Sequence, residues 1–175
     1  MLWLADSLEA IRDFMSLGGP VLRAIAVTIF LMWVLIIERI IYFRSSMKMM
    51  SREIHDEWES RPERQSWNAK QIRELMISRF SEASNKGINV IQTLVALCPL
   101  LGLLGTVTGM ISVFQVMAVS GSGNVRAMAA GVSQATVPTM AGMVGALSGV
   151  LLITLLSRRA AHEVEFLEDS LTMDH

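Results

Sequence analysis

The sequence predicts an all-α integral membrane protein with three transmembrane helices. Residues 87–125 and 127–157 contain no Asp, Glu, Lys, Arg or His, and Arg126 alone separates the two runs. A helix needs about 20 apolar residues to cross a hydrocarbon layer of ~30 Å, so each run is long enough to span a bilayer. In addition, 52% of the 175 residues are hydrophobic and the mean hydropathy is +0.46, values that are ordinary for a small membrane protein.

Residues 1–19 are predicted to form a helix that lies on the outer membrane surface. Apolar side chains recur there at helical spacing between charged ones, and Asp6 and Glu9 have the spacing of a capping box. Gly19 and Pro20 then break this helix and allow a turn into the first span.

Residues 20–43 are the first predicted span. Its uncharged stretch, between Arg23 and Glu38, is shorter than the two later runs. Arg23 can extend its charge toward one membrane surface, and we expect Glu38 and Arg39 to act as interfacial anchors at the other.

The distribution of Lys and Arg predicts an N-out, C-in orientation by the positive-inside rule. Residues 44–86 form the predicted cytoplasmic helical segment, with a break near residues 60–66, and residues 158–175 form a cytoplasmic tail that continues the third helix. The outer side has only Arg12 and Arg126, the latter in the predicted loop 120–126. The cytoplasmic cations are Arg44, Lys48, Arg52, Arg61, Arg64, Lys70, Arg73, Arg79, Lys86, Arg158 and Arg159.

Small residues line one face of the second span, 87–119, and one face of the third span, 127–157. Their spacing alternates between four and three residues, which places them on one side of a helix. Small residues let helix backbones approach closely in lipid, so we predict helix packing through Gly102, Gly105, Gly109, Gly142, Gly145 and Gly149. Because three spans alone are not expected to bury two such faces, we also predict a homo-oligomer. The complete faces are Cys98, Gly102, Gly105, Gly109 and Ser112, and Gly131, Ala135, Pro138, Gly142, Gly145 and Gly149.

The same two spans carry many hydroxyl and amide groups: Thr106, Thr108, Ser133, Gln134, Thr136 and Thr139. A single Ser or Thr in a helix usually bonds to its own helix carbonyls. An amide in lipid needs partners, so Gln134 is expected to face a neighbouring helix or a wet cavity.

The run PLLGLLGTV from Pro99, followed by Gly109, Met110 and Ile111, closely resembles the second transmembrane signature of the ExbB/TolQ/MotA proton-channel proteins. Gly19-Pro20, Glu38-Arg39 with Tyr42, and the GVSQA run from Gly131 also fit ExbB-type members, and the chain is most similar to a short ExbB-type protein of a TonB system. The resemblance implies a pentameric, multi-pass subunit of the bacterial inner membrane whose outer side is the periplasm. It further implies that the ring encloses helices of an ExbD-like single-span partner and, with a TonB-like protein, energises uptake across the outer membrane.

By resemblance, Thr106 and Thr139 are the pore-facing threonines of the family, and Gln134 stands where many members have a glutamate. We therefore predict that Thr106, Thr139 and Gln134 line the pore. The predicted spans offer no carboxylate or histidine at mid-membrane, so a partner must supply the titrating group. In the family this group is an aspartate on the ExbD-like helix.

Two other functions stay open. A flagellar stator subunit of MotA type is one, although that family has four spans and a larger cytoplasmic domain. A passive membrane scaffold or transporter subunit is the other. An enzyme is not expected, because His55, His162 and His175 are scattered and no catalytic motif, metal site or cofactor site is recognisable. The net charge of −1 gives no indication of nucleic-acid binding.

Overall fold

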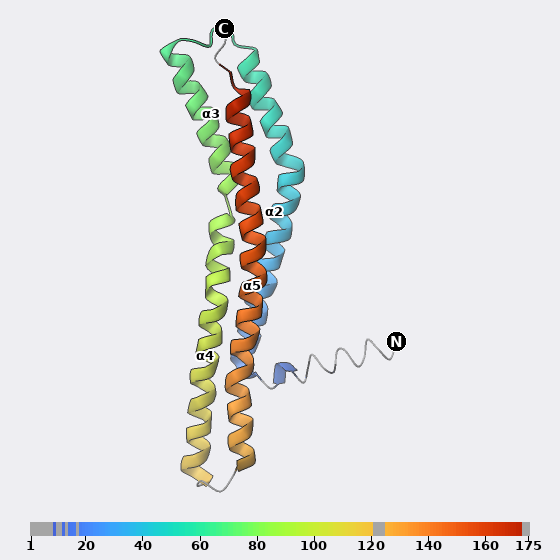
Figure 1. Cartoon of the computed structure of the whole chain (residues 1–175). Coiled ribbons are helices and arrows are strands. Elements are labelled where there is room, and N and C mark those ends of the chain that lie inside the picture. The colour runs from blue at the N-terminus through green and yellow to red at the C-terminus, as the bar shows by residue number, and fades with distance from the viewer. Residues whose placement is uncertain (1–8, 10–11, 13, 17, 121–124, 173–175) are drawn as a thin grey trace. The chain divides into compact units, whose positions relative to one another are not determined.

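The computed structural model describes residues 9, 12, 14–16, 18–120 and 125–172. These residues are arranged as α2 (Gly19–Glu59), α3 (Trp67–Asn85), α4 (Ile88–Ser120) and α5 (Val125–Ser170), as Figure 1 shows, and the described ranges contain no strand. The surface helix predicted for residues 1–19 lies largely outside the described residues, as does most of the loop predicted for residues 120–126.

Three helical stretches are long and apolar enough to cross a membrane: Gly19–Glu59, Trp67–Val119 and Val125–Ser170. The predicted all-α fold with three membrane-length helices is therefore confirmed. Only 28%, 28% and 33% of the most apolar part of these stretches is buried within the chain. The remaining apolar surface is expected to face lipid or other chains, because exposing so much apolar surface to water is unfavourable.

Two of the helices run well past the predicted ends of their spans. α2 has 41 residues and α5 has 46, so they are about 60 Å and about 70 Å long at 1.5 Å per residue. No glycine or proline interrupts α2 between residue 21 and its end at Glu59, so the first span and the first part of segment 44–86 form one continuous helix. The chain then breaks around Pro62, and Ser66 caps α3 by accepting a 3.2 Å hydrogen bond from Ala69 N.

The second stretch, Trp67–Val119, is divided at Gly87 into α3 and α4. Gly87 has a φ of +84°, a conformation that residues with a side chain rarely adopt. Lys86 N donates to Glu82 O at 2.9 Å to close the last turn of α3, and α4 begins at Ile88. The glycine thus separates the charged segment from the apolar helix that follows.

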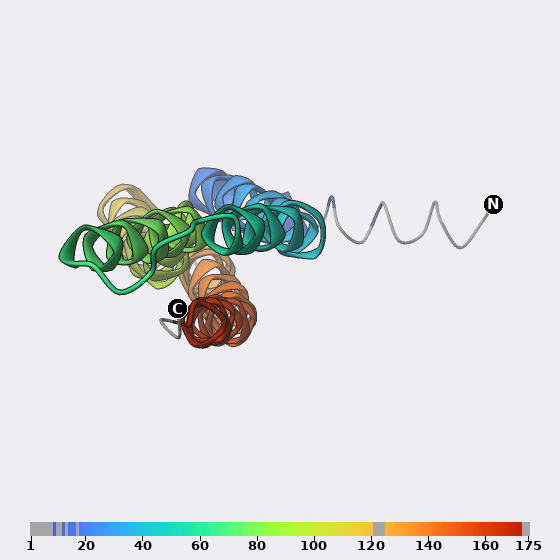
Figure 2. The ribbon, with the colours of Figure 1, turned by 90° about the horizontal axis from the view of Figure 1, so that it is seen from above.

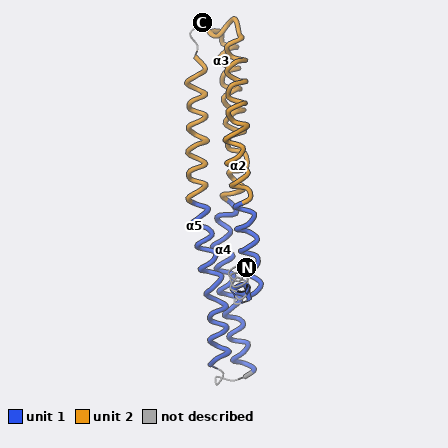
Figure 3. Tube along the Cα trace, turned by 90° about the vertical axis from the view of Figure 1, so that its right-hand side faces the viewer, with its two compact units in different colours: residues 1–33, 93–150 blue, residues 34–92, 151–175 orange. Residues whose placement is uncertain are grey.

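Residues Met1–Trp33 and Thr93–Val150 form one compact unit, drawn blue in Figure 3. Each of its helices contributes one buried stripe, with neighbouring members three or four residues apart. This average spacing near 3.5 is typical of helices that pack along each other at a small crossing angle. The stripes are Leu22, Ile25, Thr28 and Met32 in α2; Val95, Cys98, Gly102, Gly105, Gly109 and Val113 in α4; and Gly131, Ala135, Pro138, Gly142, Gly145 and Gly149 in α5.

Residues Val34–Gln92 and Leu151–His175 form the second unit, drawn orange in Figure 3. In Figure 2 its three long helical segments, α3, the C-terminal part of α2 and the end of α5, stand at the corners of a triangle. Large side chains fill this unit, and Trp58, Phe80, Met47, Leu167 and Leu171 are each at most 1% exposed. The charged segment between the first two spans is therefore folded around a real core.

Candidate functional site in the paired helices α4 and α5

Helices α4 and α5 touch backbone to backbone through their glycines. A Cβ built on Gly109 would lie 2.5 Å from the Cα of Ala135, and one built on Gly102 would lie 3.0 Å from the Cα of Thr139. A Cβ on Gly142 would lie 2.5 Å from the carbonyl oxygen of Cys98. Real Cβ atoms essentially never approach other atoms to 2.5 Å, so Gly109 and Gly142 accept only glycine without a backbone shift, and at Gly102 the neighbouring backbone would have to give way slightly.

The two small-residue faces are therefore buried inside one chain, largely against each other, with Ile29 and Met32 of α2 also packing on Gly145 and Gly149. All six glycines that the sequence assigns to helix packing are buried in this unit. The expectation that three spans cannot bury both faces is wrong. The glycine faces therefore do not by themselves indicate a homo-oligomer. The physical reason is that α4 and α5 are consecutive helices and pair directly with each other. Val113 rather than Ser112, which is half-buried, ends the face of α4.

Helix α2 covers one flank of the α4–α5 pair. The Cγ1 of Val21 lies 3.5 Å from the Cβ position of Gly105 in α4, and Ile29 lies against Gly145 in α5. At the start of α2, Gln134 Nε2 lies 2.6 Å from the Cβ position of Gly19. Gln134 thus faces a neighbouring helix within the same chain, on the α2 flank.

Thr106 and Thr139 lie on the opposite flank. Successive residues of a helix are about 100° apart around its axis. The Cβ position of Gly105 lies 2.5 Å from the Cβ of Pro138 in α5 and 3.5 Å from Val21 in α2, so Gly105 lies on the α2 side of the α4–α5 contact. Thr106, the next residue, is turned about 100° further around α4 and falls on the side away from Val21. The same reasoning on α5 puts Thr139 on the side of Gly142 that is opposite to Gln134. The structure therefore brings the two threonines to one flank that α2 does not cover. It places Gln134 on the other flank, beside α2.

The hydroxyl groups on this uncovered flank are anchored as donors. Thr139 Oγ1 donates a 3.0 Å hydrogen bond to Gly102 O, which joins α5 to α4. Thr106 Oγ1 donates to Leu103 O of its own helix at 2.7 Å. Each hydroxyl oxygen keeps lone pairs that can accept a hydrogen bond from another group. Around them the flank is apolar and open: Leu103 and Phe114 are each 60% exposed.

Arg39 is placed differently from an interfacial anchor. It is 5% exposed, and its Nη2 donates to Ala83 O at 2.8 Å and to Ser84 O at 3.1 Å. The guanidinium also lies 4.7 Å from the ring centre of Tyr42. A cation on the last carbonyls of a helix satisfies them and offsets the helix dipole, so Arg39 caps the C-terminus of α3. The anchor role of Glu38, which is exposed, stays a prediction.

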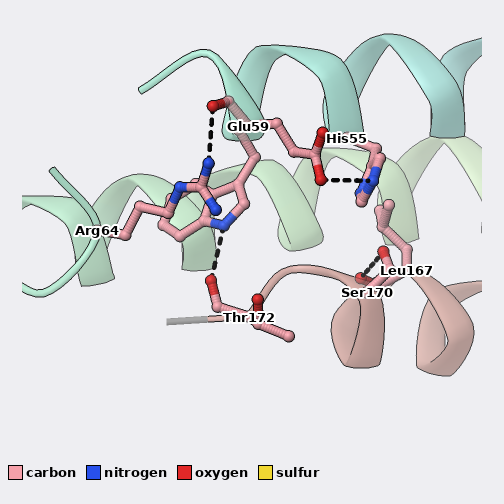
Figure 4. Close-up of polar contacts among 7 residues, drawn as sticks. His55, Glu59, Arg64, Leu167, Ser170 and Thr172 are labelled. Atoms are coloured by element: carbon pink, nitrogen blue, oxygen red, sulfur yellow. Dashed lines mark hydrogen bonds and ion pairs between the residues drawn. The ribbon is translucent and has the colours of Figure 1, made fainter. Parts of the chain in front are cut away.

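Two side chains that the sequence did not mark as structural contacts fasten the end of α5. Trp58 Nε1 in α2 donates a 2.9 Å hydrogen bond to Thr172 O, a contact that appears in the close-up of Figure 4. Arg73 in α3 donates from Nε to Leu171 O at 2.8 Å and from Nη2 to Glu168 O at 2.7 Å. A tryptophan within a highly charged segment was the available signal, because such a residue usually marks a buried site.

Comparison with known proteins agrees with this architecture. Residues 37–169 match the model of the MotA/TolQ/ExbB proton channel family, a range that includes α3, α4 and nearly all of α5. The chain is also similar to the "Putative biopolymer transport protein ExbB-like 1" of Synechocystis sp., with 34% identity over 84 residues. That alignment covers 46% of this chain and 33% of the relative, so the chain matches about a third of the relative's length. Because the family match extends over most of the sequence and contains the α4–α5 pair, the chain belongs to the MotA/TolQ/ExbB proton channel family.

Proposed function

We propose that the chain is the ring-forming subunit of an ExbB-type motor that is driven by the proton-motive force in the bacterial inner membrane. Its partners are an ExbD-like single-span protein and a TonB-like protein, and the complex energises uptake through outer-membrane receptors. Family membership supports a proton-channel motor subunit. The observation that carries the finer proposal is the shared position of Thr106 and Thr139 on the flank of α4 and α5 that α2 leaves open.

In this proposal the open flank faces the interior of the ring. Between Thr93 and Val150 the sequence has no Asp, Glu or His, so this part of the subunit cannot itself accept and release a proton. Because the hydroxyls of Thr106 and Thr139 donate to backbone carbonyls, their oxygens are left as acceptors. They are suited to orient a water molecule or the protonated carboxyl of a partner aspartate.

The apolar surface that one chain leaves uncovered supports the proposed ring. About seven-tenths of the most apolar part of each stretch is not buried, although the glycine faces are already packed inside the chain. In the proposed assembly, neighbouring subunits and lipid share this surface. The number of five subunits comes from the family resemblance.

The test replaces Thr106 and Thr139 by valine, singly and together. Valine keeps the shape and removes the hydroxyl, so assembly with the ExbD-like partner should survive while proton-coupled uptake falls. Thr108→Val is the matched control, because Thr108 is an exposed threonine of α4 that bonds to Leu104 O at 3.0 Å and Gly105 O at 3.1 Å in its own helix. Growth on a scarce nutrient imported by an energised receptor is the readout, and native mass spectrometry checks assembly.

Full uptake by an assembled double valine variant would show that these threonines serve helix packing only. A loss of uptake in Thr108→Val equal to that of the other two variants would also remove the assignment. A neighbouring reading frame that encodes one span with an aspartate near its start, followed by a small periplasmic domain, separates the motor from a passive scaffold.

A further inference from the structure

An exposed carboxylate stands on the outer face of α2 in the second unit. Glu38 lies in a shallow hollow of about 470 Å³ whose other walls include Ile37 and Ile41, together with the polar groups of Tyr42 and Ser45. Glu38 has no ion pair with any residue in the described ranges. The adjacent Arg39 does not compensate it, because that guanidinium is turned into the bundle toward α3. Glu38 is thus an acid without an ion-pair partner in the described ranges, beside both apolar side chains and hydroxyl groups.

A second hollow, of about 480 Å³, opens at the junction of α3 and α4. Arg79 and Lys86 line it together with Glu82 and Asn85, so its charged walls carry a net charge of one positive unit. Neither cation forms an ion pair with another part of the described chain. The two hollows therefore have opposite charge and lie on different helices of the same unit.

The hydrogen bonds of Arg39 show that the two hollows lie at the same level along the unit. Arg39 follows Glu38 directly in α2, and it bonds to the carbonyls of Ala83 and Ser84 at 2.8 and 3.1 Å. Ala83 itself lines the basic hollow, and Lys86 follows within one helical turn. Glu38 and the basic hollow thus differ little in height on the subunit.

In a cyclic assembly, two patches can meet only if they lie at the same height along the ring axis. Rotation about the ring axis carries no translation, so the two different patches that meet at a head-to-tail interface must lie at the same level along that axis. We propose that Glu38 of one subunit inserts into the basic hollow of the next and pairs with Lys86 and Arg79. This proposal rests on the proposed ring with its axis along the helices. The pairing removes an isolated carboxylate from an apolar surface, where the low dielectric strengthens an ion pair.

Cysteine cross-linking tests the contact directly. One chain carries Glu38→Cys and a second, tagged chain carries Lys86→Cys, both on a Cys98→Ala background, and the two are co-expressed. Oxidation should give a dimer that contains both chains, since the contact is between subunits. Glu53→Cys with Lys86→Cys is the matched control, because Glu53 is an exposed acid of the same helix four turns further along. It should cross-link severalfold less.

Charge reversal gives an independent readout. Glu38→Lys should lower the fraction of chains in rings severalfold in native mass spectrometry, and adding Lys86→Glu to it should restore that fraction. Lys86 is also the C-cap residue of α3, so Arg79→Glu is the second variant if Lys86→Glu does not fold. Restoration by either pairing supports the contact.

The outcomes separate this inference from the ring itself. If the unmodified protein is monomeric with and without its partner, the proposed ring is wrong and the contact is wrong with it. If rings form but the two cysteines do not cross-link and charge reversal has no effect, only the contact is wrong. If Lys86→Gln instead releases a bound anionic phospholipid from intact rings, the basic hollow holds a lipid phosphate, and the pairing with Glu38 is overturned.

Discussion

The carbonyl oxygen of Cys98 in α4 occupies the space that a side chain on Gly142 of α5 would need, since a Cβ there would lie 2.5 Å from it. A similar contact joins Gly109 to the backbone of Ala135. The α4–α5 pair is therefore held at a separation that only glycine permits, and the position of the Thr106 and Thr139 flank depends on that separation.

Gly142→Ala should destabilise the subunit by about 1–3 kcal/mol, because its methyl group meets backbone that cannot move aside. Gly145→Ala should be partly rescued by Ile29→Ala, since there the obstructing atoms are the Cγ1 and Cδ1 of the Ile29 side chain and alanine lacks both. Ile29→Ala should not rescue Gly142→Ala. Thermal unfolding in detergent measures all four variants, and equal rescue of both glycine variants would contradict the argument.

Arg39→Leu should loosen the end of α3, because the carbonyls of Ala83 and Ser84 lose their buried donor. The expected loss is about 1–3 kcal/mol of stability, and hydrogen exchange should rise in the last turn of α3. Arg44→Leu is the control, since Arg44 is an exposed residue of the same helix. An unchanged exchange rate in Arg39→Leu would mean that water molecules bond to the two carbonyls in place of the guanidinium and that the last turn of α3 loses no stability.

Gln134→Glu should be tolerated or slightly stabilising. The side-chain amide lies beside Gly19, the first residue of α2, and a negative charge near a helix N-terminus gains about 0.3–1 kcal/mol from the helix dipole. Gln134→Lys, of opposite charge, should lower the unfolding temperature at the same site. If both variants shift that temperature in the same direction, the size of the side chain at residue 134, and not its charge, determines the effect on stability.

Trp58→Phe should release the end of α5 while keeping an aromatic ring in the core of the second unit. The variant loses the Nε1 donor to Thr172 O and part of the buried ring volume, so a loss of at least about 1 kcal/mol is expected, together with faster proteolysis of the C-terminal end. Trp67→Phe serves as the control, because Trp67 is 72% exposed. Equal proteolysis of both variants would remove the role assigned to the indole hydrogen bond.

The N-out, C-in orientation predicts that cysteines at residues 60 and 122 react from opposite sides of the membrane. Ser60→Cys and Ser122→Cys are each made on a Cys98→Ala background and treated with an impermeant thiol reagent. Ser122→Cys should react in intact spheroplasts and Ser60→Cys only after permeabilisation. Reaction of both from the same side would overturn the arrangement of three spans.

Much of the fold was predictable from the sequence, because charge and hydropathy act along the chain. The uncharged runs predicted the membrane-length helices, and Pro62 with its polar neighbours predicted the break between α2 and α3. The alternating spacing of small residues predicted which side of α4 and α5 is buried. These features depend on residues that are close in sequence, which is why helical periodicity reports them.

What each face packs against was decided only by the tertiary structure. The spacing of glycines in α4 and α5 is the same whether the two faces meet within one chain or between chains, so the sequence did not exclude the wrong pairing. Likewise, nothing near Arg39 indicates that it reaches the end of α3, and the nearness of Gln134 to Gly19 brings together residues far apart in the chain. The periodicity of side chains indicates that a face is buried. Which helix covers that face depends on how the helices associate in three dimensions.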